Sequence, residues 1–205
     1  MKSARKSFLR GDHSVAVTEF KRLAEAGREA VTLREPGGTP IGEAIRGVVK
    51  FPPGDEPISP DAELLLMNAS RAQLVQQAIR PALAKDAVVL CDRFYDSSLA
   101  YQGYGRGLDL TKVRQAIDLA VGETKPNLTL LLDIPLAVSQ SRVGGRRQST
   151  GEGQDQFDQA GDSFFERVHA GFHVLAKGEP ERYRVIDGTQ SPEAVAEVVW
   201  DLSLI

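Results

Sequence analysis

Charged side chains that could handle a phosphate group recur near the ends of the short apolar runs of this sequence. Arginine forms bidentate, charge-assisted hydrogen bonds with phosphate and does not lose its charge. Carboxylates in the same place would repel phosphate unless a cation lay between them, and Mg²⁺ held partly through water meets that need. Arginine and acid together therefore indicate phosphoryl transfer, in which catalysis is mainly positioning and neutralisation of charge; exposed ion pairs without chemistry are the alternative. The acids are Glu35 and Asp92, and the arginines are Arg34, Arg71, Arg93, Arg106, Arg142, Arg146 and Arg147.

The elements that must position these charges are predicted by short apolar runs that alternate with helical patterns. Two of the runs, Ala87–Cys91 and Leu128–Leu132, are almost continuously apolar, which is typical of strands covered on both faces. Strands that alternate with helices indicate an α/β fold, with a parallel sheet flanked by helices. Ligands of such sheets bind outside the carboxyl ends of the strands, where several of these charges would meet. The other predicted strands are Ala30–Leu33 and Arg184–Ile186.

Helix signals lie between the predicted strands. Ser59 and Pro60 open the clearest helix, because serine is a favoured N-cap and proline a favoured first residue. Apolar residues then recur at roughly helical spacing as far as Leu83, and Pro81 is expected to kink or end this helix. Further helices are predicted at Leu110–Val121, Ser163–Ala176 and Pro192–Leu202.

The composition is that of an ordinary globular protein. The chain has 205 residues, with 25 Lys and Arg against 28 Asp and Glu and a net charge of −3, so a single domain over residues 1–205 is expected. The mild acidity argues against a nucleic-acid partner, which usually selects a basic excess. No apolar run approaches the roughly 18 residues of a membrane span, and the N-terminus lacks the apolar core of a secretory signal. A single cysteine, Cys91, excludes an internal disulfide, so we expect a reducing, cytoplasmic location.

A polar segment between two predicted helices is a candidate lid. Residues 143–162 contain the glycine-bearing stretch Gly144–Gly161, whose length and composition suit a mobile lid over an active site. A surface loop without function would have the same composition. The adjacent Arg146 and Arg147 favour the lid, because they could deliver charge to a phosphate.

Two histidines, His169 and His173, lie four residues apart on a predicted helix, a spacing that can bind a metal ion. The sequence shows no third ligand near them. Half-buried or surface histidines without a metal are therefore the favoured interpretation.

Three motifs in combination resemble the bacterial thymidylate kinase family. They are Arg34–Thr39 (REPGGT), Asp92-Arg93-Phe94 followed by Ser97–Gly103 (SSLAYQG), and Pro126–Thr129 (PNLT) running into Leu132-Asp133. The resemblance extends from about Leu23 to the C-terminus. It implies the fold of the P-loop nucleoside monophosphate kinases, transfer of the γ-phosphoryl group of ATP to dTMP with Mg²⁺, and a homodimer.

The resemblance also implies the residues on the acceptor side. Arg93 matches the arginine that binds the dTMP phosphate and the transferring group, and Asp92 and Glu35 match the acids of the magnesium site. Pro36 matches a position that the family tends to hold in cis, and Arg71 matches the arginine that reaches the thymine base. The other residues expected to line the base, sugar or phosphate are Arg34, Met67, Ser98, Tyr101 and Gln102.

On the donor side, the resemblance places Arg142, Arg146 and Arg147 among the donor-side and lid arginines. Thr189 and Gln190 fall near the adenine loop.

Two side chains depart from the family pattern. Met67 stands where the family usually stacks an aromatic ring on thymine, and a thioether can press on that ring with less rigid geometry. The lid reads Asp155–Asp158 (DQFD) where the family often has Asp-Arg-Ile-Glu, so Arg146 or Arg147 would replace the missing lid arginine.

The largest departure concerns residues 1–22. The family opens with an apolar strand and the loop G-x-x-x-x-G-K-[ST], which cradles phosphates; no such motif occurs in this chain. The loop should fall near Ser7–Ser14 (SFLRGDHS), where Gly11 matches the last glycine, Asp12 takes the lysine position and Ser14 supplies a hydroxyl. The preceding strand is expected to be missing, because Met1–Ser7 is polar and basic.

Two explanations of this segment remain open. The residues before Leu23 come from a shifted reading frame or a wrong start, or the chain is a degenerate relative that binds dTMP but cannot use ATP. The resemblance stops abruptly before Leu23. This favours the first explanation, because gradual divergence would have spread the sequence differences along the whole chain.

Overall fold

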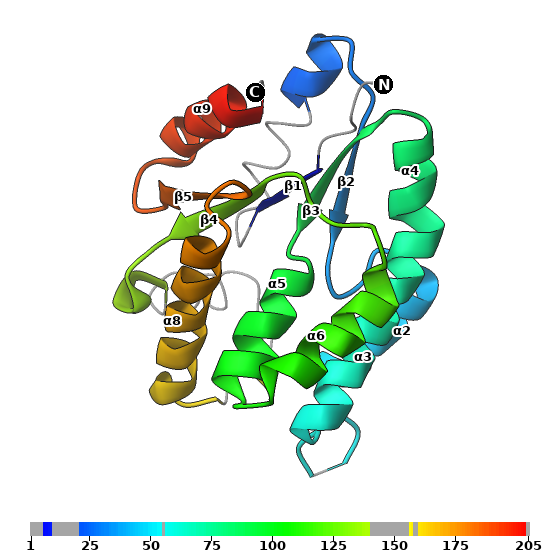
Figure 1. Ribbon diagram of the computed structural model, residues 1–205, viewed down its shortest axis with the longest axis vertical. Coiled ribbons are helices and arrows are strands. Elements are labelled where there is room, and N and C mark those ends of the chain that lie inside the picture. Colours follow the sequence, from blue (N-terminus) through cyan, green and yellow to red (C-terminus); the bar gives the residue numbers. More distant parts are fainter. Residues whose placement is uncertain (1–5, 10–20, 55, 140–155, 158–159, 204–205) are drawn as a thin grey trace.

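The computed structural model describes residues 6–9, 21–54, 56–139, 156–157 and 160–203, and the strands in this part of the chain all run parallel (Figure 1). One sheet has the order β1-β3-β2, and β4 pairs with β5 in a second. Because β1 lies beside β4, the strands follow one another as β2-β3-β1-β4-β5. The strands are β1 (Lys6–Leu9), β2 (Ala30–Arg34), β3 (Val88–Asp92), β4 (Thr129–Asp133) and β5 (Tyr183–Asp187).

The first strand corrects the expectation that the opening strand is missing, and it overlaps the start of the expected loop position, Ser7–Ser14. Lys6–Leu9 pairs in parallel with β3, with Leu9 opposite Asp92, and lies in the middle of the strand order. The prediction was wrong because it relied on apolar side chains, whereas strand pairing uses backbone N–H and C=O groups that every non-proline residue carries.

The helices predicted from the sequence are confirmed, with small changes at their ends. Ser59 caps its helix by accepting a hydrogen bond from the Ala62 backbone N–H at 3.4 Å, and Leu110–Val121 has the predicted bounds. The sequence did not predict the helices at α2 and α5. The helices are α2 (Pro40–Lys50), α3 (Pro60–Leu74), α4 (Arg80–Ala84), α5 (Tyr95–Ser98), α6 (Leu110–Val121), α8 (Asp162–Gly178) and α9 (Pro192–Ser203).

Wider π-helical turns interrupt two of the helical stretches. η1 (Val75–Ile79) joins α3 to α4 just before Pro81, which has no N–H to donate to the preceding turn. The long helix therefore continues past Pro81 to Ala84 with a local change of winding. η2 (Leu99–Gly105) continues α5 in the same way.

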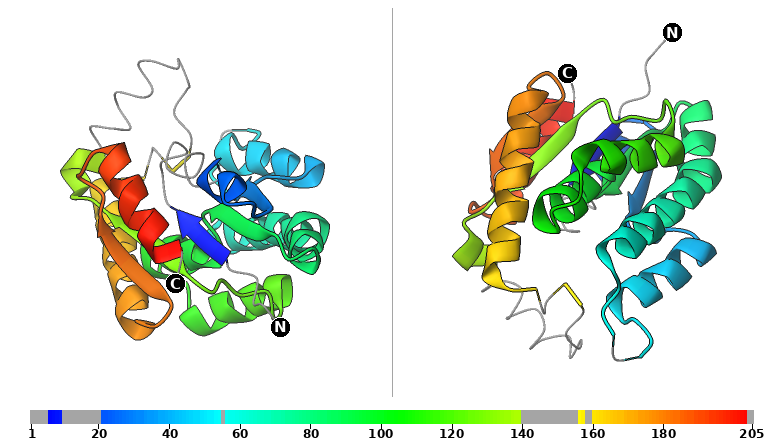
Figure 2. Two further views of the ribbon diagram at one scale, coloured as in Figure 1. Left: turned by 90° about the horizontal axis from the view of Figure 1, so that it is seen from above. Right: turned by 60° about the horizontal axis from the view of Figure 1, so that its bottom comes forward.

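Core residues lie on both faces of the sheets, as the apolar runs predicted. In β3, Val89 and Cys91 belong to the large core under α3, α6 and α8, whereas Val88 and Leu90 pack with Leu23 on the opposite face. In β4 and β5, the core with α9 forms on the face opposite α8, and Figure 2 shows these two helices on opposite sides of the strands. Helices thus cover both faces and leave the carboxyl ends of the strands for a site.

A buried ion pair ties the β4–β5 pair to the rest of the molecule. Arg182, just before β5, donates from Nη1 and Nη2 to the two carboxylate oxygens of Asp96 on α5, at 2.8 Å each. It also donates to the Thr129 hydroxyl at the start of β4 at 2.6 Å. Burial acts to lower the pKa of Arg182, but the hydrogen bonds that its guanidinium donates to Asp96 and Glu179 raise it overall.

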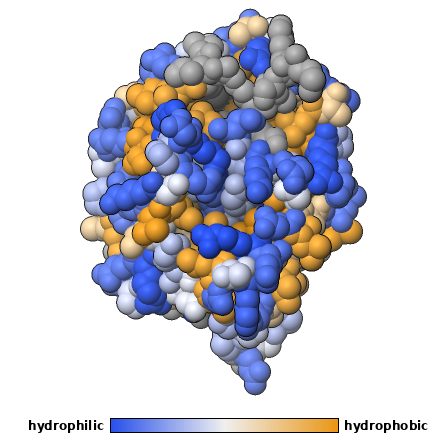
Figure 3. All heavy atoms as spheres, viewed as in Figure 1, coloured by the Kyte–Doolittle hydropathy of each residue, from blue (hydrophilic) through white to orange (hydrophobic). Residues whose placement is uncertain are grey.

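Polar and apolar residues are interspersed on the face shown in Figure 3, where apolar residues form small patches. None of the helices in the described part of the chain is long and apolar enough to cross a membrane.

Candidate active site

Glu35, Asp92 and Arg93, which the sequence singled out, meet where β2 and β3 end. Arg34 lies opposite Asp92 in the parallel register, and the Glu35 backbone N–H donates to the Asp92 carbonyl at 2.9 Å. Glu35, Asp92 and Arg93 therefore leave the sheet side by side. This grouping follows from the topology, because neighbouring parallel strands end at the same edge.

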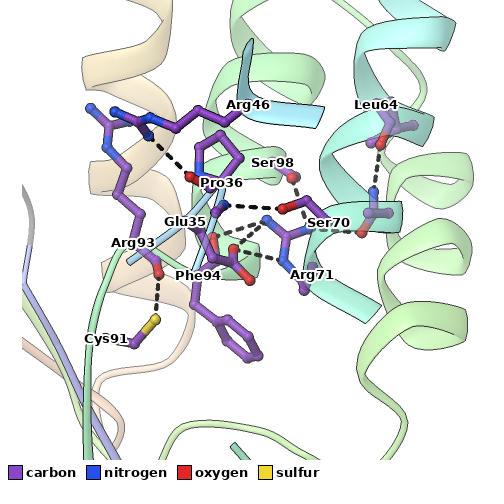
Figure 4. A network of polar contacts seen from close by, with 12 residues as sticks. Glu35, Pro36, Arg46, Leu64, Ser70, Arg71, Cys91, Arg93, Phe94 and Ser98 are labelled. Carbon is purple, nitrogen blue, oxygen red and sulfur yellow. Dashed lines mark hydrogen bonds and ion pairs between the residues drawn. The ribbon is translucent and has the colours of Figure 1, made fainter. Parts of the chain in front are cut away.

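The loop after β2 is held in a fixed shape by its neighbours. The Glu35–Pro36 peptide bond is cis, as the resemblance implies. The Gly37 N–H donates to Ser70 Oγ on α3 at 3.1 Å, and Arg46 Nη1 on α2 donates to the Pro36 carbonyl at 3.0 Å (Figure 4). Thr39 then caps α2 by accepting from the Gly42 N–H at 3.0 Å.

Arg71 is the centre of a buried polar network (Figure 4). Its Nε donates to Glu35 Oε2 at 2.9 Å, and Nη2 lies 2.9 Å from the same oxygen. Nη1 donates to Asn68 Oδ1 at 2.7 Å and to Ser98 Oγ at 3.0 Å, and Nη2 also donates to the Phe94 carbonyl at 3.4 Å. Every nitrogen of this guanidinium thus has a partner within the protein, and the network joins β2, α3 and α5.

Glu35 keeps one oxygen out of this network. Its Oε1 is buried and has no hydrogen-bond partner in the described structure. Burial raises the pKa of the Glu35 carboxyl from its ordinary value of 4.5 to about 7, although the Arg71 charge and hydrogen bond act in the opposite direction. The site therefore holds an acid whose proton is exchanged near neutral pH.

Arg93 has an unusual backbone for its residue type. Its φ is +65°, in the left-handed region that L-residues other than glycine, asparagine and aspartate seldom adopt. The Cys91 thiol donates to the Arg93 carbonyl at 3.2 Å, and the Arg93 guanidinium lies 5.1 Å from the centroid of the Tyr101 ring. Tyr101 in turn packs edge-on against Phe164 and Phe172 of α8. The strained backbone is consistent with a functional position, because such conformations concentrate at active sites.

A second buried acid, Glu63, organises the neighbouring part of α3. Its Oε1 accepts from Gln102 Nε2 at 2.7 Å, and its Oε2 accepts from Arg106 Nη2 and Gln156 Nε2, at 2.8 Å each. Two residues that the sequence placed at the site therefore donate hydrogen bonds to Glu63. They are Gln102, which is fully buried, and Arg106. Gln156, within the predicted lid, also donates its N–H to the Lys50 carbonyl at 3.1 Å.

The remaining predicted site residues are spread over different surroundings. Arg34 is engaged by Glu43 of α2, with Nη2 at 2.9 Å from both carboxylate oxygens, and Met67 is buried on α3. Thr189 and Gln190 are exposed after β5, where Thr189 donates to Asp187. The predicted residues that lie outside the described part of the chain are Gly11, Ser14, Arg142, Arg146 and Arg147.

Four site residues were missed by the sequence reasoning, and Glu63 is one of them. Asn68 and Ser70 lie on the helix that carries Arg71, and the three-residue spacing from Asn68 to Arg71 could have indicated a shared face. Arg46 lies in α2, which was not predicted, although Thr39 and Pro40 carry an ordinary helix-start signal.

A family model described as thymidylate kinase matches residues 14–199 of the chain. The chain belongs to the thymidylate kinase family. The thymidylate kinase of Geobacter sulfurreducens is 47% identical over 194 residues, which cover 91% of this chain and 90% of that protein. That of Thermomicrobium roseum is 45% identical over 179 residues, covering 87% and 82%. The crystal structure of thymidylate kinase from Ehrlichia chaffeensis superimposes with a TM-score of 0.74 at 28% identity and covers 99% of both chains.

Membership of the thymidylate kinase family makes the chain a kinase, and hence a transferase, with the fold of the P-loop nucleoside monophosphate kinases. Both conclusions confirm what the three sequence motifs implied. The family match begins at residue 14, after the β1 strand and after Gly11 and Asp12 of the expected loop position.

Proposed function

We propose that this member of the thymidylate kinase family transfers the γ-phosphoryl group of ATP to dTMP, giving dTDP and ADP on the route to dTTP. The observation that carries the proposal is the meeting of Asp92, Arg93 and the buried Glu35 at the ends of β2 and β3, in a chain that matches thymidylate kinases over most of its length. Arginine beside acids at the carboxyl edge of a parallel sheet is suited to holding phosphate together with a cation.

Arg93 has the central role on the acceptor side of this proposal. It binds the dTMP phosphate and offsets the charge that develops on the transferring group, which is the kind of interaction that lowers the barrier to phosphoryl transfer. Met67, Tyr101, Ser98 and Arg34 line the base, sugar or phosphate.

Arg71 helps to recognise the thymine side of the pocket. Its nitrogens already hold Glu35, Asn68 and Ser98 in place, so the base meets a preorganised surface and costs little reorganisation on binding.

The residues at this edge fit a magnesium ion. Carboxylate oxygens are the donors that Mg²⁺ prefers, and Glu35 Oε1 is a buried oxygen that lacks a partner. Asp92 and Glu35 would hold the ion, partly through water, and when bound it would neutralise charge on the phosphates. A nearby cation would also favour the ionised form of Glu35 over the protonated form that burial favours.

The donor nucleotide belongs on the neighbouring part of the same edge. β1 ends at Leu9 opposite Asp92, so the chain leaves this strand where the phosphates of ATP would lie. The proposed contacts with ATP are Gly11, Ser14, Arg142, Thr189 and Gln190, with Arg146 and Arg147 acting from a lid over residues 143–162. A single domain, a homodimer and a cytoplasmic location complete the proposal.

The test is the release of ADP that depends on dTMP, measured for the wild type, for Arg93→Ala and for the control Arg28→Ala. Arg28 is an exposed arginine away from the site, so its variant removes the same charge without touching the reaction. We expect Arg93→Ala to lower kcat by about 10²–10³-fold, and Arg28→Ala to leave it unchanged.

Calorimetric titration with dTMP separates the alternatives. Binding of dTMP without any ADP release would favour the degenerate relative that cannot use ATP. Turnover that is equal in the wild type and Arg93→Ala would overturn the role of Arg93, and saturation by dCMP or UMP in place of dTMP would replace the acceptor.

A further inference from the structure

A cluster of potential metal ligands lies at the end of β4, on other elements than the proposed magnesium site. His169 Nε2 and His173 Nε2 lie 3.0 Å and 3.2 Å from the same oxygen, Oδ1 of Asp133. Asp133 is the last residue of β4, and both histidines belong to α8. The third ligand that the sequence did not reveal is therefore supplied by a strand 36 and 40 residues away along the chain.

The separations of these atoms suit coordination of a single ion. One ligand atom from each residue lies within 4.8 Å of the others, and the two imidazole rings are 4.6 Å apart at their centroids. Two donor atoms about 2.0–2.1 Å from one zinc ion at the tetrahedral angle are about 3.3–3.4 Å apart. The two separations from Asp133 Oδ1 are within a few tenths of an ångström of that value, and the imidazole nitrogens, no more than 4.8 Å apart, would have to turn towards a shared ion.

The chemistry of the donors selects the kind of metal. Two imidazoles and one carboxylate favour Zn²⁺, Co²⁺ or a similar transition metal, whereas Mg²⁺ prefers a shell of oxygen donors. The three side chains are only partly exposed, at 34–39%, so they are accessible to an ion in solution and leave a coordination position open to water.

We propose that Asp133, His169 and His173 form a binding site for a divalent transition-metal ion, with Zn²⁺ as the reference ion. The bound ion replaces the protons that otherwise join the two imidazoles to the carboxylate, and it ties the end of β4 to α8. The site does not depend on the proposed phosphoryl transfer.

The experiment is equilibrium dialysis of the full chain, without a polyhistidine tag, against Zn²⁺ and against Co²⁺ in the presence of excess Mg²⁺. We expect one ion per chain. Because loss of even an outer-shell partner weakens metal binding by about 10–100-fold, His169→Gln, His173→Gln and Asp133→Asn should each weaken it by at least about 10-fold. Zn²⁺ should also raise the melting temperature of the wild type and not that of these variants.

Asp187→Asn is the matched control. Asp187 lies opposite Asp133 in the β4–β5 register, but its Oδ1 accepts from the Thr189 N–H and hydroxyl, so the variant removes a neighbouring negative charge without removing a ligand. It should bind Zn²⁺ like the wild type. The proposal is overturned if the wild type binds no ion, if Mg²⁺ displaces the ion, or if Asp187→Asn weakens binding as much as Asp133→Asn. Thiolate-to-metal charge-transfer absorption in the Co²⁺ protein would assign the ion to Cys91 and would also overturn it.

Discussion

Glu35 and Arg71 are ionisable residues in a buried site, where an unpaired charge lowers the free energy of unfolding. Both side chains are almost completely removed from water, and each depends on the other for compensation. Removing one partner of such a pair commonly costs about 3–5 kcal/mol, because the other charge is left buried alone. The network fixes Glu35 and Ser98 in one arrangement before any ligand arrives, at the cost of an acid that is protonated more readily than usual.

This raised pKa predicts how stability varies with pH. The folded chain keeps the Glu35 proton up to about pH 7, whereas the unfolded chain releases it near 4.5. The folded state therefore binds more protons within this window, so the free energy of unfolding falls as the pH rises from 4.5 to 7, by up to about 3 kcal/mol. The contribution is complete below the window and absent above it.

Urea unfolding of the wild type and Glu35→Gln across this pH range checks the prediction. The variant cannot titrate at this position, so the difference between the two curves should change with pH and isolate the contribution of Glu35. Glutamine resembles the protonated acid that the folded chain keeps below about pH 7, so only the change of this difference with pH is diagnostic. Two parallel curves would contradict the raised pKa.

At the scale of the elements, the loop between β2 and α2 is shaped by glycine. Gly38 has φ +78°, and a Cβ atom placed on it would lie 2.7 Å from Leu74 Cδ1, which is fully buried on α3. The loop thus lies directly against α3, and a side chain at this position would strain the backbone and overpack the core together.

Gly38→Ala is expected to destabilise the chain by about 1–3 kcal/mol more than Gly54→Ala. Gly54 is a matched control, because its φ is +85° but nothing lies within 4 Å of a Cβ placed there. Denaturant unfolding measures both variants. Equal losses would mean that the backbone conformation alone sets the cost and that the Leu74 contact contributes nothing.

At the scale of the whole molecule, two packed helices carry strongly exposed leucines. Leu65 on α3 is 64% exposed and Leu119 on α6 is 90% exposed, and α3 packs against α6. If the chain forms the expected homodimer, these leucines are suited to an interface, because burying them in a second chain removes apolar surface from water.

We expect light scattering to give the mass of a dimer for the wild type, and Leu119→Lys and Leu65→Lys to shift it towards the monomer. Val174→Lys on α8 is the control, because Val174 is an exposed aliphatic residue, at 52%, on another helix. A monomeric wild type would contradict the homodimer. A dimer that withstands both leucine changes would place the interface on another face.

The fold was predictable from the sequence where side chains carry the signal. The continuous apolar runs became β3 and β4, and the Asp109 cap with its helical pattern became α6. β1 was not predictable, because it has only four residues, two of them polar, and its pairing with β3 uses the backbone. α2 was concealed because it directly follows the REPGGT motif, which was interpreted as a strand end and loop.

For the candidate site, the sequence predicted many of the residues but not the hydrogen bonds that connect them. The family resemblance indicated Glu35, Arg71 and Ser98, but their hydrogen bonds span 36 and 27 residues and exist only in the folded chain. The same limit applies to Asp133, which no local pattern connects with His169 and His173. Sequence spacing reveals partners on one helix, whereas partners from different strands and helices are set by topology.

Cys91 can serve as a built-in chemical probe of local opening of the core around β3. It is the single cysteine of the chain, it lies in the core of β3 beside the candidate site, and burial raises the pKa of its thiol. Alkylating reagents attack the thiolate form, so the folded chain should resist labelling. Each modified molecule should therefore have passed through a local opening in which the helices packed on β3 move away and expose Cys91. The rate of alkylation would therefore follow transient exposure of the sheet beneath the proposed active site, without an introduced probe.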